Sequence, residues 1–256
     1  MSSPESLTLV RHGESAFNSI RTQRESDPLY HSFVSAFEGD PESDMTVRLA
    51  SELKDMFPVN YRDFDTPLTE MADVDIKTMA RNLSERIVTP DVIFTSPYAR
   101  SITTLEYMIA AWPELGNKRI VVDERLRERD HGMSLLYFDW RIFAAIKPEE
   151  RKLREMQGKY WYRLPNGENI PDLRIRTDSW LFSLSENHPD QNVIAISHYL
   201  PILAVRASLE EFDSKEFERL DREDEPINAG VTVYRKMPDS SNQAKLQLQS
   251  YNMKLY

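Results

Sequence analysis

Short apolar segments rich in β-branched residues recur along this chain and are separated by segments with helical periodicity. Strands that alternate with helices favour a largely parallel sheet with right-handed crossovers and helices on both faces. We therefore predict an α/β fold, a three-layer sandwich around a mostly parallel central sheet. The apolar segments are 7–10, 91–95, 119–122 and 192–197, and two alternating segments, 230–235 and 245–250, close the sequence.

Helical patterns fill most of the segments between the predicted strands. Two long stretches exceed the usual length of a connection between strands. The pattern near 65–87 has Thr69 placed as its N-cap. Segment 19–64 is polar and weakly periodic, and a single helix, near 45–56, is expected in it. We expect one domain over residues 1–256, with cap-like insertions at about 19–64 and 133–165. The other helices are expected near 97–112, 138–157 and 169–187, and from Tyr199 onward.

The composition excludes several kinds of protein. Of the 256 residues 40% are hydrophobic, yet no apolar run approaches the ~20 residues that span a membrane. The N-terminus lacks a basic region followed by an apolar stretch, so no signal peptide is visible, and a cytoplasmic location without a membrane partner is expected. Because the chain has no cysteine, disulfides, thiolate metal sites and cysteine-phosphatase chemistry are excluded.

The net charge of −10 bears on the partners that the chain can bind. A strongly acidic surface repels polyanions, so no nucleic-acid partner is expected. A phosphate ligand would need a local cationic pocket within this acidic chain. The sequence also shows no Asp/Glu/His cluster at metal-ligand spacing, and no metal or other cofactor is expected.

The first apolar segment ends in a dipeptide suited to phosphate chemistry. Arg11 and His12 follow the run from Leu7 to Val10, and Gly13 then provides a turn. Loop residues at the carboxyl end of a strand in an α/β sheet face the crevice where ligands bind. Arginine offers a planar fork for phosphate oxygens, and a neutral imidazole can attack phosphorus.

Three further predicted strands deliver polar side chains at their carboxyl ends. Arg100 follows the strand at 91–95, Glu128 follows the strand at 119–122, and His198 follows the strand at 192–197. If these strands are parallel, their ends share one edge of the sheet. The sequence therefore predicts one crevice lined by two histidines, two arginines and a glutamate.

These segments resemble the histidine phosphatase superfamily, which has the phosphoglycerate mutase-like fold. The opening motif Arg11-His12-Gly13-Glu14-Ser15 is similar to the motif that begins that family's chains. Matching segments run from residue 7 to about 235 with gaps, so the resemblance covers most of the chain. The other similar segments are Thr95 to Arg100, Leu126 to Gly132, Tyr160 to Asp172 followed by Arg176, and Val193 to His198.

The resemblance implies a role for each candidate residue. His12 would be the nucleophile that becomes phosphorylated, and its other ring nitrogen is expected to donate to a backbone carbonyl near Gly13. Glu128 would be the proton donor to the leaving oxygen. Tyr199 stands where the family usually has glycine, beside the phosphate pocket, where it could narrow the pocket or hydrogen-bond the substrate. The phosphate ligands would be Arg11, Asn18, Arg100 and His198.

The leading hypothesis is a metal-independent phosphomonoesterase that acts on a small phosphorylated metabolite through a phosphohistidine. One alternative is a cofactor-dependent phosphoglycerate mutase, but the segment from Gly132 to Trp140 is nearly uncharged and lacks the basic residues that would hold a bisphosphate. A catalytically silent phosphate-binding or scaffold protein is the other alternative, although such a protein needs neither a nucleophile nor an acid.

Two further expectations concern packing. Ala72, Asp75 and Ile76 replace the Gly and Gln-Ala that the family usually shows, and they are expected on a helix away from the crevice. The closing strand could be an exposed edge that pairs between subunits, so a homodimer is left open.

Overall fold

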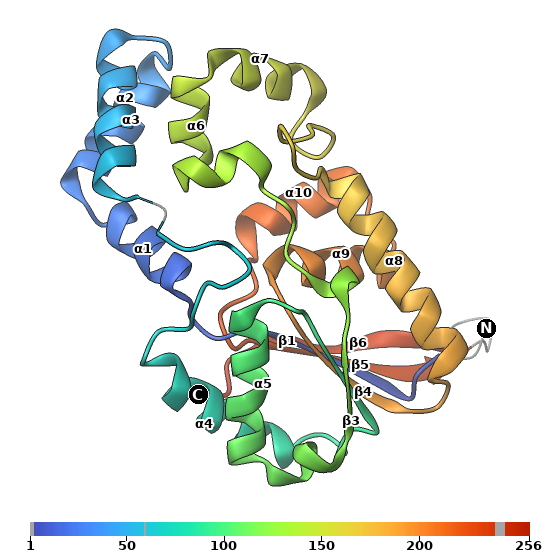
Figure 1. The fold of residues 1–256 in the computed structure, drawn as a ribbon. Coiled ribbons are helices and arrows are strands. Elements are labelled where there is room, and N and C mark those ends of the chain that lie inside the picture. The colour runs from blue at the N-terminus through green and yellow to red at the C-terminus, as the bar shows by residue number, and fades with distance from the viewer. Residues whose placement is uncertain (1–2, 59, 239–243) are drawn as a thin grey trace. The chain divides into compact units, whose positions relative to one another are not determined.

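The computed structural model describes residues 3–58, 60–238 and 244–256. The chain divides into two compact units (Figure 1). We call the first, made of Met1–Ser15, Asp63–Glu128 and Asp172–Tyr256, the sheet unit, and the second, made of Ala16–Arg62 and Arg129–Pro171, the helical unit. The two segments of the helical unit overlap the expected insertions at 19–64 and 133–165. One domain over residues 1–256 stays a prediction.

The sheet unit is built on six strands in the order β3-β2-β4-β1-β5-β6. The pairs β1–β4, β2–β4 and β2–β3 are parallel, whereas β5 runs antiparallel to both β1 and β6. The predicted α/β class with a mostly parallel sheet is thus confirmed. The strands are β1 (Ser6–Arg11), β2 (Val92–Thr95), β3 (Arg119–Val122), β4 (Asn192–Ser197), β5 (Val231–Pro238) and β6 (Ala244–Met253).

Helices cover both faces of this sheet (Figure 1). Alternate side chains of β1 enter different cores: Val10 packs with α4 and α5, while Leu7 and Leu9 pack with α8 and α9. Because side chains alternate along a strand, each central strand must be apolar throughout to serve both cores. The helices of this unit are α4 (Ala72–Ser84), α5 (Ala99–Ala111), α8 (Ile170–Asn187), α9 (Tyr199–Leu209) and α10 (Ser214–Glu223), with short 3₁₀ turns η1 (Pro113–Asn117) and η2 (Glu124–Leu126).

The helical unit has a core of its own, formed around Phe33, Leu53 and Phe143. The described part of segment 19–64 holds three helices where one was expected, so the expectation of a single helix is wrong. The expected helix near 45–56 is α3, which Ser43 caps, whereas the two helices before it were missed; of these, α2 has a local start signal, because Asp27 caps it just before Pro28. The helices are α1 (Ala16–Glu25), α2 (Pro28–Gly39), α3 (Asp44–Met56), α6 (Trp140–Ile146) and α7 (Pro148–Gln157), with the 3₁₀ turn η3 (Gly132–Tyr137).

The expected N-cap at Thr69 is also wrong. Helix α4 begins later, at Ala72, and its capping residue Met71 makes no side-chain cap hydrogen bond. The Thr69 hydroxyl donates instead to the Glu14 carboxylate at 3.0 Å, and the Thr69 backbone N–H donates to the Glu14 carbonyl at 2.9 Å. Thr69 therefore joins the start of α4 to the loop after β1.

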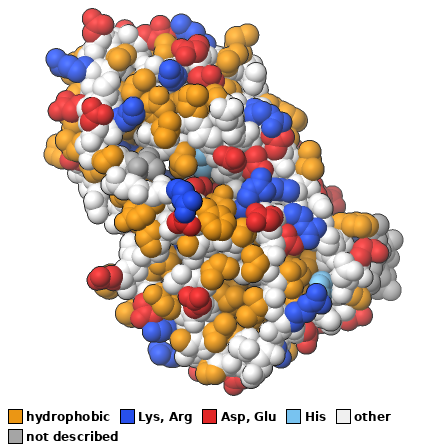
Figure 2. All heavy atoms as spheres, in the orientation of Figure 1, with side chains coloured by type: hydrophobic (Ala, Val, Ile, Leu, Met, Phe, Trp, Pro, Cys, Tyr) orange, Lys and Arg blue, Asp and Glu red, His pale blue; other side chains and the backbone are white. Residues whose placement is uncertain are grey.

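The surface carries charges of both signs, interspersed over the visible face without a single basic field (Figure 2). The absence of a basic field on this face is consistent with a chain whose net charge is −10. Within the described ranges, no helix combines the length and the apolar character that crossing a membrane requires.

Candidate active site

His12 lies directly after β1, where its backbone N–H donates to the carbonyl of Ser197 on the neighbouring strand β4 at 3.0 Å. The side chain is buried. Its Nδ1 lies 2.6 Å from the carbonyl oxygen of Gly13, and because a carbonyl only accepts, Nδ1 carries the proton. The expected hydrogen bond near Gly13 is thus confirmed, and in the neutral ring Nε2 keeps the lone pair that a nucleophile needs.

The surroundings of His12 favour that neutral form. Burial lowers the pKa of His12 well below its ordinary value, and the positive charges of Arg100 and Arg11 lower the pKa further. The Gly13 carbonyl acts in the opposite direction but does not outweigh them. At neutral pH the ring is therefore uncharged, which is the state that attack on phosphorus requires.

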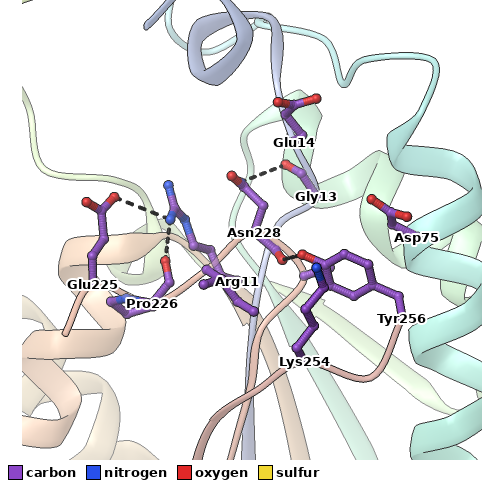
Figure 3. A pocket seen from close by; sticks show the side chains of 11 residues that line it. Arg11, Gly13, Glu14, Asp75, Glu225, Pro226, Asn228, Lys254 and Tyr256 are labelled. Carbon is purple, nitrogen blue, oxygen red and sulfur yellow. Dashed lines mark hydrogen bonds and ion pairs between the residues drawn. The ribbon is translucent and has the colours of Figure 1, made fainter. Parts of the chain in front are cut away.

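Arg11, the last residue of β1, is the first cation of the site. Its Nη1 donates to the carbonyl of Pro226 and lies 3.5 Å from the Glu225 carboxylate, as Figure 3 shows. Its guanidinium lies 5.6 Å from the centre of the Tyr199 ring. The side chain is buried, and these contacts hold it in one orientation.

Arg100 is the second cation and lies in the first turn of α5, just after β2. Its Nη1 lies 2.9 Å from the Asp63 carboxylate and donates to the Asp63 carbonyl at 2.7 Å. Its Nε donates to Nδ1 of His198 at 3.3 Å. The Tyr98 ring covers the guanidinium at 4.7 Å. Arg100 is thus held on three sides beside the two histidines.

His198 follows β4 and begins α9, with its ring centroid 5.0 Å from that of His12. Since Nδ1 accepts from Arg100, the proton of the neutral ring is on Nε2, which lies 2.7 Å from the Ser96 hydroxyl and 3.3 Å from the Ser101 hydroxyl. Burial, followed by the charge of Arg100, lowers the pKa of His198 well below its ordinary value. Both ring nitrogens have protein partners, so His198 also orients Arg100.

Glu128 lies two residues beyond η2 and is half-buried. Arg176 of α8 supports its backbone by donating to the carbonyls of Arg125 at 2.7 Å and Glu128 at 3.0 Å. Burial first, and then nearby carboxylates that include Glu128, raise the pKa of Tyr98 to about 12. Glu128 makes the smallest of these contributions, after Asp63, and its role as the proton donor stays a prediction.

The sequence also predicts Tyr199 and Asn18 at the phosphate pocket. The Tyr199 hydroxyl donates to the Asp221 carbonyl at 2.8 Å and to the Asp221 carboxylate. Burial and the charge of Asp221 raise the pKa of Tyr199. Its hydroxyl therefore has a structural partner, and a contact with substrate stays a prediction. Asn18 lies in α1, in the helical unit, and its role as a phosphate ligand likewise stays a prediction.

Ala72 and Ile76 do not lie away from the crevice, and that expectation is wrong. A Cβ atom added to Gly13 would lie 2.5 Å from Ile76 Cδ1 and 3.2 Å from Ala72 Cβ. Both side chains are buried directly against the turn that follows His12. Asp75 lines a pocket of about 570 Å³ together with Arg11 (Figure 3). Only a glycine at position 13 leaves room for α4 to pack against the turn that follows His12.

Several polar residues of the site were not identified from the sequence. Asp63 holds Arg100, Ser96 and Ser101 face His198, and Asn228 contacts the backbone of His12. Ser96 stands within the Thr-Ser-Pro segment already singled out, so its position was a usable signal. Asp63 and Asn228 come from loops, and no local pattern marks them. Across the described residues, no group of three or more His, Cys, Asp or Glu side chains could hold a metal ion.

Solved structures show the same fold. A mycobacterial glucosyl-3-phosphoglycerate phosphatase, solved in complex with inorganic phosphate, is 18% identical to this chain, with a TM-score of 0.64 over 98% of each chain. The structure of Bacillus stearothermophilus YhfR is 18% identical, with a TM-score of 0.63 over 98% of this chain and 99% of that one.

Sequence comparison identifies a curated relative and a family. Phosphoserine phosphatase 1 of Hydrogenobacter thermophilus is 27% identical over 154 residues, which are 60% of this chain and 69% of that protein. The model of the histidine phosphatase superfamily (branch 1) matches residues 59–244, a range that includes Arg100, Glu128 and His198, while Arg11 and His12 precede it. The chain therefore belongs to branch 1 of the histidine phosphatase superfamily and is an enzyme of the phosphoric monoester hydrolase class.

Proposed function

We propose that this enzyme hydrolyses phosphomonoesters of small metabolites through a phosphohistidine formed on His12, without a metal ion. The observation that carries the proposal is the state of His12. Its proton is held on Nδ1 by the Gly13 carbonyl, and burial, followed by the charges of two guanidinium groups, lowers its pKa. A buried neutral imidazole beside two cations suits attack on a dianionic phosphate ester.

The first half of the reaction transfers the phosphoryl group to the enzyme. Arg11 and Arg100 would bind the phosphate oxygens, since each presents a fixed guanidinium at the carboxyl edge of the sheet. Nε2 of His12 attacks phosphorus while the bond to the ester oxygen breaks. Glu128 donates its proton to that oxygen, and the alcohol leaves.

The second half of the reaction regenerates the enzyme. Glu128, now a carboxylate, takes a proton from a water molecule that attacks the phosphohistidine. The nitrogen–phosphorus bond breaks, inorganic phosphate is released, and His12 returns to its neutral state. His198 and Asn18 are proposed as further phosphate ligands, and Tyr199 as a residue that limits the pocket.

The relatives support a small substrate. One is named for phosphoserine and another for glucosyl-3-phosphoglycerate, and both names describe low-molecular-weight phosphomonoesters. Neither name specifies the substrate of this chain. The proposal therefore covers the class of small phosphorylated metabolites.

The experiment is a phosphate-release assay on a panel that contains an aryl phosphate, phosphoserine and 3-phosphoglycerate, each with and without a chelator. The proposal expects chelator-insensitive hydrolysis that His12→Asn abolishes. The matched control is His188→Asn, because His188 contacts Gln191 and lies outside the site. Loss of activity in the chelator, or isomerisation of the phosphoglycerate that requires an added bisphosphate, would contradict the proposal.

A further inference from the structure

The loop 224–230, which joins α10 to β5, donates hydrogen bonds to the backbone of the motif that begins at Arg11. The side-chain amide of Asn228 donates to the carbonyl oxygens of His12 and Gly13, both at 3.2 Å. Because both partners are carbonyls, the amide must present its nitrogen, which has two protons to give. The neighbouring Ala229 N–H also donates to the His12 carbonyl, at 3.1 Å.

The Gly13 carbonyl is the atom that decides which nitrogen of His12 carries the proton. Its peptide group belongs to a glycine, the residue with the greatest backbone freedom. The structure restrains this glycine on both sides: Gly13 N–H donates to the Thr104 hydroxyl at 3.1 Å, and its carbonyl accepts from Asn228. Without Asn228 the Gly13 carbonyl would lose this hydrogen bond and would keep the one with His12 Nδ1.

We propose that Asn228 is a positioning residue for the nucleophile, because it fixes the carbonyl that keeps the His12 proton on Nδ1. The inference rests on the proposed function for its catalytic consequence, while the position of the proton can be measured without turnover. Should Gly13 turn away, the proton would move to Nε2, the nitrogen that must attack. A misplaced proton at this point removes the lone pair from the reacting atom.

The chain's C-terminal segment holds Asn228 in turn. The Tyr256 hydroxyl donates to the Asn228 carbonyl at 2.8 Å, as Figure 3 shows. Asn252 accepts from the Ile227 N–H at 2.7 Å and donates to the Glu225 carbonyl at 3.0 Å. The loop that contacts both Arg11 and His12 is therefore hydrogen-bonded to residues 252–256. A substitution at Tyr256 should change the tautomer of His12 less than a substitution at Asn228 does.

The test combines spectroscopy with kinetics on the full chain. Nitrogen-15 NMR of the histidine rings reports the protonated nitrogen of His12 in wild type, Asn228→Ala and Tyr256→Phe. The matched control is Asn187→Ala, since Asn187 also donates its amide to a backbone carbonyl, that of Ser183 at 3.0 Å, but is exposed and contacts neither the loop 224–230 nor residues 252–256. Thermal unfolding of each variant shows that it is folded.

We expect Asn228→Ala to shift His12 toward the Nε2–H tautomer and to lower kcat about 10- to 100-fold, the range known for outer hydrogen-bond partners of ligating histidines, with KM changed less than about twofold. Tyr256→Phe should shift the His12 tautomer and kcat in the same directions but by less. If Asn228→Ala fails to fold, the Tyr256→Phe result decides whether the loop positions His12. A folded Asn228→Ala with the wild-type tautomer and wild-type kcat would overturn the inference. If no ester is hydrolysed at all, the proposed function fails and the tautomer alone decides the role of Asn228.

Discussion

His12 and His198 lie edge to face with their ring centroids 5.0 Å apart, and neither ring is charged at neutral pH. Burial is the main reason, and the charge of Arg100 contributes to both low pKa values. A pair of imidazoles this close could not both be protonated without strong repulsion. The arginines therefore supply the positive charge of the site, and the histidines supply a lone pair and a hydrogen-bond donor.

The low pKa of His12 predicts where activity is lost in acid. The nucleophile fails when its ring is protonated, and a lowered pKa moves that protonation to lower pH. We expect the acid limb of kcat/KM that belongs to His12 to fall clearly below pH 6.5, the ordinary region for histidine. The measurement is kcat/KM of an aryl phosphate from pH 4 to pH 8. An acid limb at or above pH 6.5 would contradict this assignment.

The same pKa values predict that the fold loses stability in acid. Below about pH 6.5 the unfolded chain protonates both histidines while the folded chain does not, so the unfolded state binds more protons and stability falls as pH falls. Each such histidine contributes a slope of about 1.4 kcal/mol per pH unit until its folded pKa is reached. Urea unfolding at pH 7.5 and pH 5.5 should show a smaller loss for His198→Asn than for wild type. An equal loss in both proteins would show that His198 is not neutral in the fold.

Gly13→Ala should destabilise the protein through a steric conflict with α4. The added methyl group would lie 2.5 Å from Ile76 Cδ1, in a fully buried position. Overpacking of this kind typically costs about 1–3 kcal/mol. Ile76→Val deletes that Cδ1 atom, so the double variant should lose less stability than the sum of the two single variants. Additive losses in urea unfolding would mean that Gly13 is required for another reason.

Glu128→Gln should affect esters according to their leaving groups. An alkyl phosphate needs a proton on its departing oxygen and should lose kcat by about 10²- to 10⁴-fold, whereas an aryl phosphate with a good leaving group should lose less in the first step. Dephosphorylation also needs the carboxylate, so the phosphoenzyme formed from the aryl ester should accumulate. Comparison of burst and steady-state rates tests both effects, with the exposed Glu124→Gln as control. Equal losses of the first-step rate for the two esters would assign the acid to another residue.

The sequence predicted the part of the structure that local patterns encode. The apolar strands were evident because both faces of each central strand are buried, and their parallel pairing places Arg11, His12, Arg100 and His198 together. Even the Gly13 carbonyl as partner of His12 followed from chemistry, because a nucleophilic imidazole needs its other nitrogen bound.

What the sequence did not predict depends on contacts between distant segments. Asp63 approaches Arg100 from a loop, and Asn228 reaches Gly13 across 215 positions of the chain. Neither residue belongs to a local motif, so only the tertiary fold reveals its role. Helices α1 and α2 were missed for another reason: the apolar periodicity is weak there, and for α2 the capping residue Asp27 is the clearer signal.

The most direct test of the central claim is the intact mass of the protein after a rapid quench without acid during turnover of a phosphate ester. Wild type should carry one added phosphoryl group, and His12→Ala should carry none. Phosphorylation of His12→Ala to the same extent, or turnover by wild type without any adduct, would contradict a phosphohistidine on His12.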